Sequence, residues 1–174
     1  MTVVAHSLGC FVALKCAQDN SGLVWRLILL GPPPNSLPKA VSEELHARTA
    51  LVRSEGVGAV VDAVTFEETS QDTQSGDLLA LSAIRLSLLA QPAEGYAKAC
   101  TALAETILGL DIGQVDAETL IIAGADDRIG SLKVCDDYKQ RLTKVVHVKV
   151  LEGVGHWNVF EDPVGVSKAV YTFL

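Results

Sequence analysis

The sequence predicts an α/β fold in which a mostly parallel sheet of about four strands is interrupted by an all-helical insertion. Short, nearly continuous apolar runs near both ends are typical of parallel strands that are covered on both faces. Helical periodicity separates these runs, and the middle of the chain shows helical periodicity alone. We therefore predict a core part at residues 1–35, a helical lid at 36–114 and a second core part at 115–174.

The first core part begins with an apolar β-branched pair at positions 3–4, which predicts a buried strand. A helical pattern follows over residues 11–17. Between them lies the run Ala5-His6-Ser7-Leu8-Gly9, which is typical of a sharp strand-to-helix turn that exposes a serine at the end of a sheet. A second buried strand is expected at 24–30, where a glycine and three prolines end it.

The middle part has apolar residues at helical spacing and no strand pattern. Four helices are expected, near residues 42–51, 57–64, 78–89 and 96–108. Glycines at 109 and 113 close this part. An all-helical stretch between strand-bearing segments is typical of a lid over a pocket.

The last part returns to alternating strands and helices. We predict a buried strand at 119–123, a helix at 132–142 and an alternating strand at 145–151 near a sheet edge. A final helix should begin at Asp162-Pro163, because aspartate caps helices and proline suits their first position.

Composition excludes several classes of partner. The net charge is −7 without a Lys/Arg cluster, which argues against nucleic acid and anionic membranes as partners. No apolar run reaches about 18 residues, and no secretory signal is visible, so we predict a cytoplasmic location. The four cysteines lack metal-ligand spacing, so we predict reduced, mostly buried thiols and no metal site.

Ser7 is the candidate nucleophile. A serine hydroxyl is a weak nucleophile that needs an adjacent base. The start of the following helix would direct backbone N–H groups at the site, so the N–H of Leu8 is the candidate oxyanion donor. The alternative is a serine that caps an ordinary helix.

His156 is the candidate base, because it lies in a glycine-bracketed loop after the last strand. The alternative is a histidine with a purely structural hydrogen bond. Trp157 beside it is expected to line the pocket. We also place His6 in the pocket lining, with its ring turned away from the serine. His46 and His147 are expected to have structural roles.

Asp127 is the candidate partner of the histidine. A carboxylate at the end of a buried strand can orient an imidazole and stabilise its charged form. The period-two pattern of a strand cannot choose between Asp127 and Asp126, whereas Asp111 and Asp116 lie at the wrong end of the strand. Serine, aspartate and histidine follow one another in chain order, each at the carboxyl end of a strand, where open α/β sheets place their sites.

These motifs resemble the α/β-hydrolase fold family. The serine run has Ala5 where the most common family pattern has Gly, and the other matching positions are Gly124, Asp127, Gly155, His156, Glu161 and Pro163. The resemblance favours Asp127 over Asp126. It implies a Ser-His-Asp triad that cleaves a carboxylic ester or lactone through an acyl-enzyme, without a cofactor or metal.

Two stretches of the helical part, residues 53–63 and 92–100, are similar to 3-oxoadipate enol-lactonases. This resemblance implies a carboxylate-bearing lactone or ester as the substrate. A non-catalytic, hydrolase-derived binding protein is the alternative class, against which the complete triad argues. Fold and triad do not distinguish a hydrolase from an acyltransferase or a carbon–carbon bond hydrolase.

In this family, strands before the serine turn form the other half of the sheet, and a His-Gly loop there supplies a second oxyanion donor. Residues 1–6 hold neither feature. We therefore predict an N-terminally truncated hydrolase with impaired turnover, because losing one oxyanion donor costs about a hundred- to a thousandfold in rate. We also predict an exposed edge on the first strand through which chains could associate. The alternatives are a second chain that completes the sheet and a functional half-domain.

Overall fold

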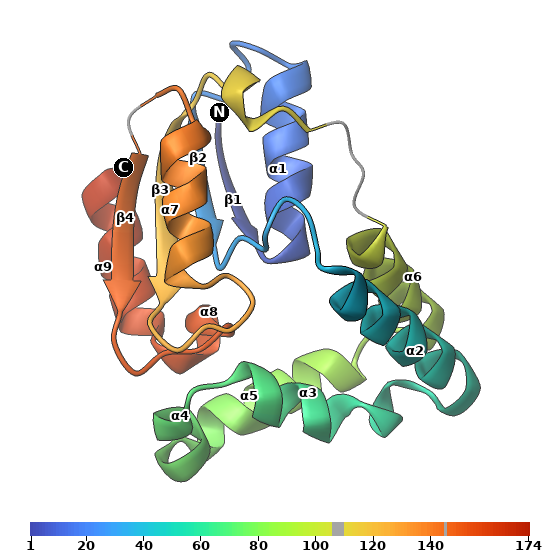
Figure 1. Ribbon diagram of the computed structural model, residues 1–174. Coiled ribbons are helices and arrows are strands. Elements are labelled where there is room, and N and C mark those ends of the chain that lie inside the picture. The colour runs from blue at the N-terminus through green and yellow to red at the C-terminus, as the bar shows by residue number, and fades with distance from the viewer. Residues whose placement is uncertain (106–109, 145) are drawn as a thin grey trace.

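The computed structural model describes residues 1–105, 110–144 and 146–174, and its four strands form one parallel sheet in the order β1-β2-β3-β4. The strands are β1 (Thr2–His6), β2 (Arg26–Leu30), β3 (Glu118–Gly124) and β4 (Val146–Leu151). The predicted parallel sheet of about four strands is confirmed. Because the strands are parallel, their carboxyl ends meet at one edge of the sheet, which lies at the bottom in Figure 1.

Helices cover both faces of this sheet (Figure 1). The helices α1 (Leu8–Asp19) and α7 (Leu132–Arg141) pack on one face, and α9 (Pro163–Phe173) packs on the other. Along β2, Leu27 and Leu29 belong to the first core, whereas Ile28 and Leu30 belong to the second. A strand buried on both faces has no polar side, which explains the continuous apolar run in the sequence.

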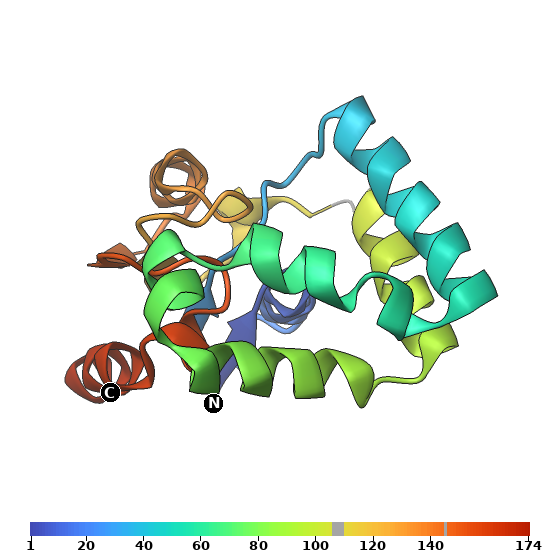
Figure 2. The same ribbon diagram turned by 90° about the horizontal axis from the view of Figure 1, so that it is seen from below.

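A helical segment, defined here as α2 to α6, lies between β2 and β3 in the chain. It comprises α2 (Lys39–Glu55), η1 (Val57–Ala59), α3 (Val61–Glu68), α4 (Gln71–Gly76), α5 (Leu78–Leu89) and α6 (Ala93–Ala104). Its helices share a separate apolar core that includes Val52, Ile84 and Ala97. Figure 2, which views the molecule from below, shows α3, α4 and α5 across the carboxyl ends of the strands, with α2 and α6 to one side.

Some predicted bounds were wrong. The helix expected at 57–64 is divided into η1 and α3. The short helix α4 was not expected, because its polar sequence has no apolar periodicity; the Ser70 side chain caps it by accepting the Thr73 N–H. The helix expected at 96–108 spans Ala93–Ala104, and its predicted end at 106–108, like Gly109 and Val145, lies outside the described residues.

Two smaller elements complete the description, η2 (Ile112–Gln114) and α8 (Asn158–Glu161). Asp162 caps α9 by accepting the Gly165 N–H, as the sequence predicts. Cys10, Cys100 and Cys135 are buried free thiols, and Cys16 is half-buried. No helix in the described part of the chain combines the length and the apolar character that crossing a bilayer requires.

Candidate active site

Ser7 lies in the turn between β1 and α1, and its backbone is strained. Its φ of 51° and ψ of −125° make it the one residue other than glycine with a positive φ within the described ranges. Side-chain sterics disfavour this conformation. The turn is held by the Ser7 N–H, which donates to the Leu30 carbonyl at 3.0 Å, and by the Cys10 N–H, which donates to the Ser7 carbonyl at 2.8 Å. The backbone therefore places the serine beyond the carboxyl end of the sheet.

This strain predicts an unusual effect on stability. Glycine adopts a positive φ without steric cost, so we expect Ser7→Gly to be more stable than Ser7→Ala by about 1 kcal/mol. Thermal unfolding of the two variants would measure the difference. As a control, the exposed Ser82 within α5 should show the opposite order, with glycine about 1 kcal/mol less stable than alanine. If Ser7→Gly unfolded at a lower temperature than Ser7→Ala, the proposed backbone strain at Ser7 would be contradicted.

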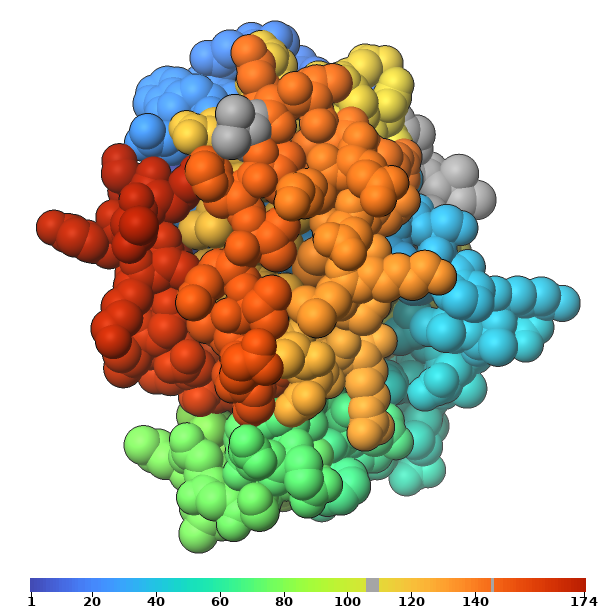
Figure 3. Space-filling model, turned by 60° about the vertical axis from the view of Figure 1, so that its left-hand side comes forward, coloured from blue at the N-terminus to red at the C-terminus, as the bar shows by residue number. Residues whose placement is uncertain are grey.

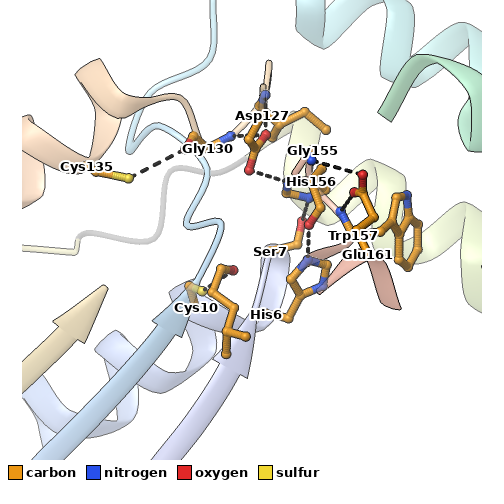
Figure 4. Close-up of polar contacts among 12 residues, drawn as sticks. His6, Ser7, Cys10, Asp127, Gly130, Cys135, Gly155, His156, Trp157 and Glu161 are labelled. Atoms are coloured by element: carbon orange, nitrogen blue, oxygen red, sulfur yellow. Dashed lines mark hydrogen bonds and ion pairs between the residues drawn. The ribbon is translucent and has the colours of Figure 1, made fainter. Parts of the chain in front are cut away.

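A chain of hydrogen bonds joins the three predicted residues (Figure 4). The Ser7 Oγ–H faces His156 Nε2 at 2.8 Å. The His156 Nδ1–H donates to Asp127 Oδ2 at 2.9 Å. The other oxygen, Asp127 Oδ1, accepts the N–H groups of Ile129 and Gly130, both at 2.8 Å. The structure thus brings the predicted serine, histidine and aspartate together.

Asp127 and His156 are both buried and stabilise each other's charged forms. Burial raises the pKa of Asp127, but its hydrogen bond to His156 and its backbone partners outweigh this, so the pKa lies below its ordinary value. Burial lowers the pKa of His156, but the hydrogen bond and charge of Asp127, with smaller contributions from Glu68 and Glu161, raise it overall. This electrostatic environment favours a histidine that accepts a proton.

His6 and Trp157 line the same pocket as Ser7 and His156. The His6 Nε2–H donates to the His156 carbonyl at 2.8 Å, and the two rings lie 4.9 Å apart between centroids. Burial and the nearby His156 lower the pKa of His6 to about 4, so His6 stays neutral near pH 7. His46 and His147 are exposed, and neither lines this pocket.

Leu8 is the first residue of α1, directly after the serine. Its N–H donates to no acceptor within the described ranges. A helix N-terminus with a free N–H favours negative charge nearby. This position suits a donor to an oxygen bound at Ser7.

A pocket of about 760 Å³ opens beside Ser7 and His156. The helical segment contributes an apolar wall that includes Leu45, Val64 and Leu88. Charged side chains, among them Arg48, Glu68 and Arg128, also line it. A second hollow of about 540 Å³, lined by β4 and α9, contains none of the predicted site residues.

Gly31 contributes to the site in a way that the sequence did not reveal. Its φ is +51°, and a Cβ there would lie 2.9 Å from Asp127 Oδ2 and 3.0 Å from His156 Nδ1. Any side chain at this position would therefore press on the hydrogen bond between the two residues. The only signal in the sequence was a glycine that ends a strand.

Arg48 and Glu68 were also missed, because they lie in helices far from the motifs. Arg48 Nη1 and Glu68 Oε1 form an ion pair at 3.2 Å on the pocket wall. Burial raises the pKa of Glu68, and the charges of His156 and Arg48 oppose this. This pair places two half-buried charges on the wall of the pocket that also contains the candidate base.

Solved structures share this arrangement of elements. A thermophilic esterase from Thermogutta terrifontis matches with a TM-score of 0.90 and 22% identity, over 99% of this chain and 64% of that one. An enol-lactonase from Burkholderia xenovorans matches with a TM-score of 0.85 and 21% identity, over 98% of this chain and 64% of that one. At these identities the likeness shows the fold, and the chain spans less than two thirds of both proteins.

Comparisons of the sequence agree with these structural matches. The probable lysophospholipase BODYGUARD 2 of Arabidopsis thaliana is 40% identical over 53 residues, which is 30% of this chain and 11% of that protein. The alpha/beta hydrolase fold family matches residues 1–163, nearly the whole chain. The chain therefore belongs to the alpha/beta hydrolase family.

Proposed function

We propose that this protein is a serine hydrolase that cleaves a carboxylic ester or lactone through an acyl-enzyme. The observation that carries this proposal is the hydrogen-bond chain from Ser7 Oγ through His156 to Asp127, at the wall of a pocket. The serine is strained and faces a base whose pKa is raised. These features support a nucleophile that is activated by an adjacent histidine.

In the proposed acylation step, Ser7 Oγ attacks the carbonyl carbon while His156 Nε2 accepts the serine proton. The Leu8 N–H stabilises the negative oxygen of the tetrahedral intermediate. His156 then donates the proton to the leaving oxygen, and the carbonyl–oxygen bond breaks. Asp127 keeps the Nδ1–H tautomer of His156 and stabilises the imidazolium. In deacylation, water attacks the acyl carbon while His156 Nε2 accepts one of its protons. The bond between that carbon and Ser7 Oγ then breaks, His156 returns the proton to Ser7 Oγ, and the carboxylic acid leaves.

The pocket supports an ester or lactone with an apolar body, and we propose that the helical segment acts as its lid. A carboxylate on the substrate, which the enol-lactonase resemblance implies, would meet two guanidinium groups on the pocket wall. Arg48 is already paired with Glu68. Arg128 lines the pocket and makes no hydrogen bond or ion pair with another described residue. Arg128 is therefore the cation available to such a carboxylate.

A fluorophosphonate probe tests the proposal, because it reacts with an activated serine without requiring ester turnover. We expect one adduct, which peptide mass spectrometry places on Ser7. The labelling rate should rise with pH as His156 loses its proton, and the rise should continue above pH 6.5 because the pKa of His156 is raised. A folded chain that stays unlabelled, or that is labelled on another serine, would refute the assignment and favour a binding protein.

A further inference from the structure

Glu161, in α8, connects the loop that carries His156 to the helical segment. Its Oε2 accepts three donors: the Ser70 N–H at 2.9 Å, the Thr73 Oγ–H at 2.9 Å and the Gly155 N–H at 3.0 Å. Its Oε1 accepts the Trp157 N–H at 3.0 Å. Figure 4 shows the carboxylate of Glu161 facing Gly155 and Trp157, the two neighbours of the histidine in the chain.

The same two parts of the chain also meet through their backbones. The His156 N–H donates to the Glu68 carbonyl at 2.8 Å. A Cβ at Gly155 would lie 2.7 Å from Ser70 N and 2.8 Å from the Glu68 carbonyl oxygen, so the loop lies directly against the corner between α3 and α4. In Figure 3, green atoms of the helical segment lie against the orange and red atoms of the C-terminal part of the chain. The loop and this corner form one packed unit.

We propose that Glu161 is a positioning residue that holds the backbone on both sides of His156 against the α3–α4 corner. This inference rests on the proposed function, since its purpose is to fix the base relative to Ser7. Glu161 makes no hydrogen bond with Ser7 or with the His156 side chain. It acts on the base through the Gly155 and Trp157 backbone. Any movement of the helical segment must then leave the α3–α4 corner in place.

A carboxylate is the group that this position requires, because all four neighbours are donors. A glutamine has the same shape but carries one oxygen and one NH₂ group. If the NH₂ group replaces Oε1, it faces the Trp157 N–H. If it replaces Oε2, it faces the Ser70, Thr73 and Gly155 donors. In either orientation Glu161→Gln leaves at least one half-buried or buried donor without its acceptor.

The test compares Glu161→Gln with the parent chain in two measurements. The first is the rate of fluorophosphonate labelling between pH 5 and 9. We expect it to fall about ten- to a hundredfold, because small displacements of a catalytic group are costly. The midpoint of the pH curve should also move to lower pH, because the negative charge of Glu161, which contributes to the raised pKa of His156, is lost. The other titratable groups that act on this ring are Asp127, which is hydrogen-bonded to it, Glu68 through its charge, and the neutral His6, whose ring lies beside it.

The second measurement is amide hydrogen exchange, which does not depend on reactivity. We expect the amides of residues 155–157 to exchange about ten times faster or more in Glu161→Gln, because local opening becomes easier. Amides within β3, such as that of Ile121, should exchange at the parental rate. This pattern would show that the substitution loosens the loop and leaves the sheet intact.

Two neighbouring acids provide matched controls. Glu152→Gln makes the same change of charge at an exposed position before the loop and should leave the labelling rate and the pH midpoint unchanged. Asp162→Ala removes the cap of α9, where Asp162 accepts the Gly165 N–H at 2.8 Å. It should lower the melting temperature and leave labelling unchanged, which separates a loss of stability from a loss of positioning.

Parental labelling and parental exchange at 155–157 in Glu161→Gln would overturn the inference. Failure of the proposed function gives a different result, because the parent chain itself would then not be labelled on Ser7. The exchange experiment would still test the role of Glu161 in that case. If Glu161→Gln does not fold, Thr73→Val removes one donor to the same oxygen with little change of shape. Thr73→Val should lower the labelling rate and speed the exchange at 155–157 to a smaller extent than we expect for Glu161→Gln. If it changed neither quantity, the inference would also be overturned.

Discussion

Replacing Ser7 with alanine is expected to lower fluorophosphonate labelling and any ester or lactone hydrolysis by at least about 10⁴-fold. The substitution removes the Oγ that His156 Nε2 faces at 2.8 Å, and with it the atom that would carry the acyl group. Neither His156 nor Asp127 can replace it, because their hydrogen bond to each other holds both in place. Labelling kinetics and hydrolysis of short p-nitrophenyl esters would measure the loss.

The matched control is Ser36→Ala, which changes an exposed serine in the loop after β2. It should keep the parental labelling rate. Circular dichroism should show that both variants remain folded. Hydrolysis that survives unchanged in Ser7→Ala would contradict the proposed nucleophile, whatever the labelling pattern.

Replacing Asp127 with asparagine is expected to lower the labelling rate by about 10³- to 10⁴-fold. Asp127 Oδ1 accepts two backbone N–H groups, from Ile129 and Gly130, so the oxygen of an asparagine amide has to remain on that side. The NH₂ group then faces His156 Nδ1 and donates to it. This places the imidazole hydrogen on Nε2, which can no longer accept the proton of Ser7.

The same substitution should change the pH dependence. Asp127 is the main cause that raises the pKa of His156 against the effect of burial. Its removal therefore lowers that pKa, and the remaining activity should reach its half-maximum at a lower pH. Asp126→Asn, at the adjacent exposed position, should change neither the rate nor the midpoint. If Asp126→Asn lowered the labelling rate and Asp127→Asn did not, Asp126 would be the carboxylate that orients His156.

The sequence alone could predict the sheet and the positions of the motifs. Strands covered on both faces, such as β2 and β3, leave continuous apolar runs, and Ser7, Asp127 and His156 follow strand ends. The choice between Asp126 and Asp127 could not come from strand periodicity, which stops at Gly124. The structure turns Asp127 inward through the backbone donors of Ile129 and Gly130, a local geometry that no apolar pattern encodes.

The supporting contacts could not be predicted, because they join distant parts of the chain. Glu161 meets Ser70 and Thr73 across about ninety positions of sequence, and α4, which carries Thr73, has no apolar pattern. Gly31 approaches the Asp127–His156 bond only once β2 and β3 are paired. Such contacts depend on the tertiary arrangement, and composition and periodicity describe local structure only.

The contact between His6 and the His156 carbonyl limits how many histidines in the pocket can take up a proton. The ring of His6 uses its Nε2–H on that carbonyl, and burial keeps its pKa at about 4. The pocket thus contains two imidazoles, of which His6 stays neutral near pH 7, whereas the raised pKa of His156 favours its protonated form. Between pH 5 and 8, the contribution of histidine to reactivity should follow the curve of a single ionisation, with the slope of one proton.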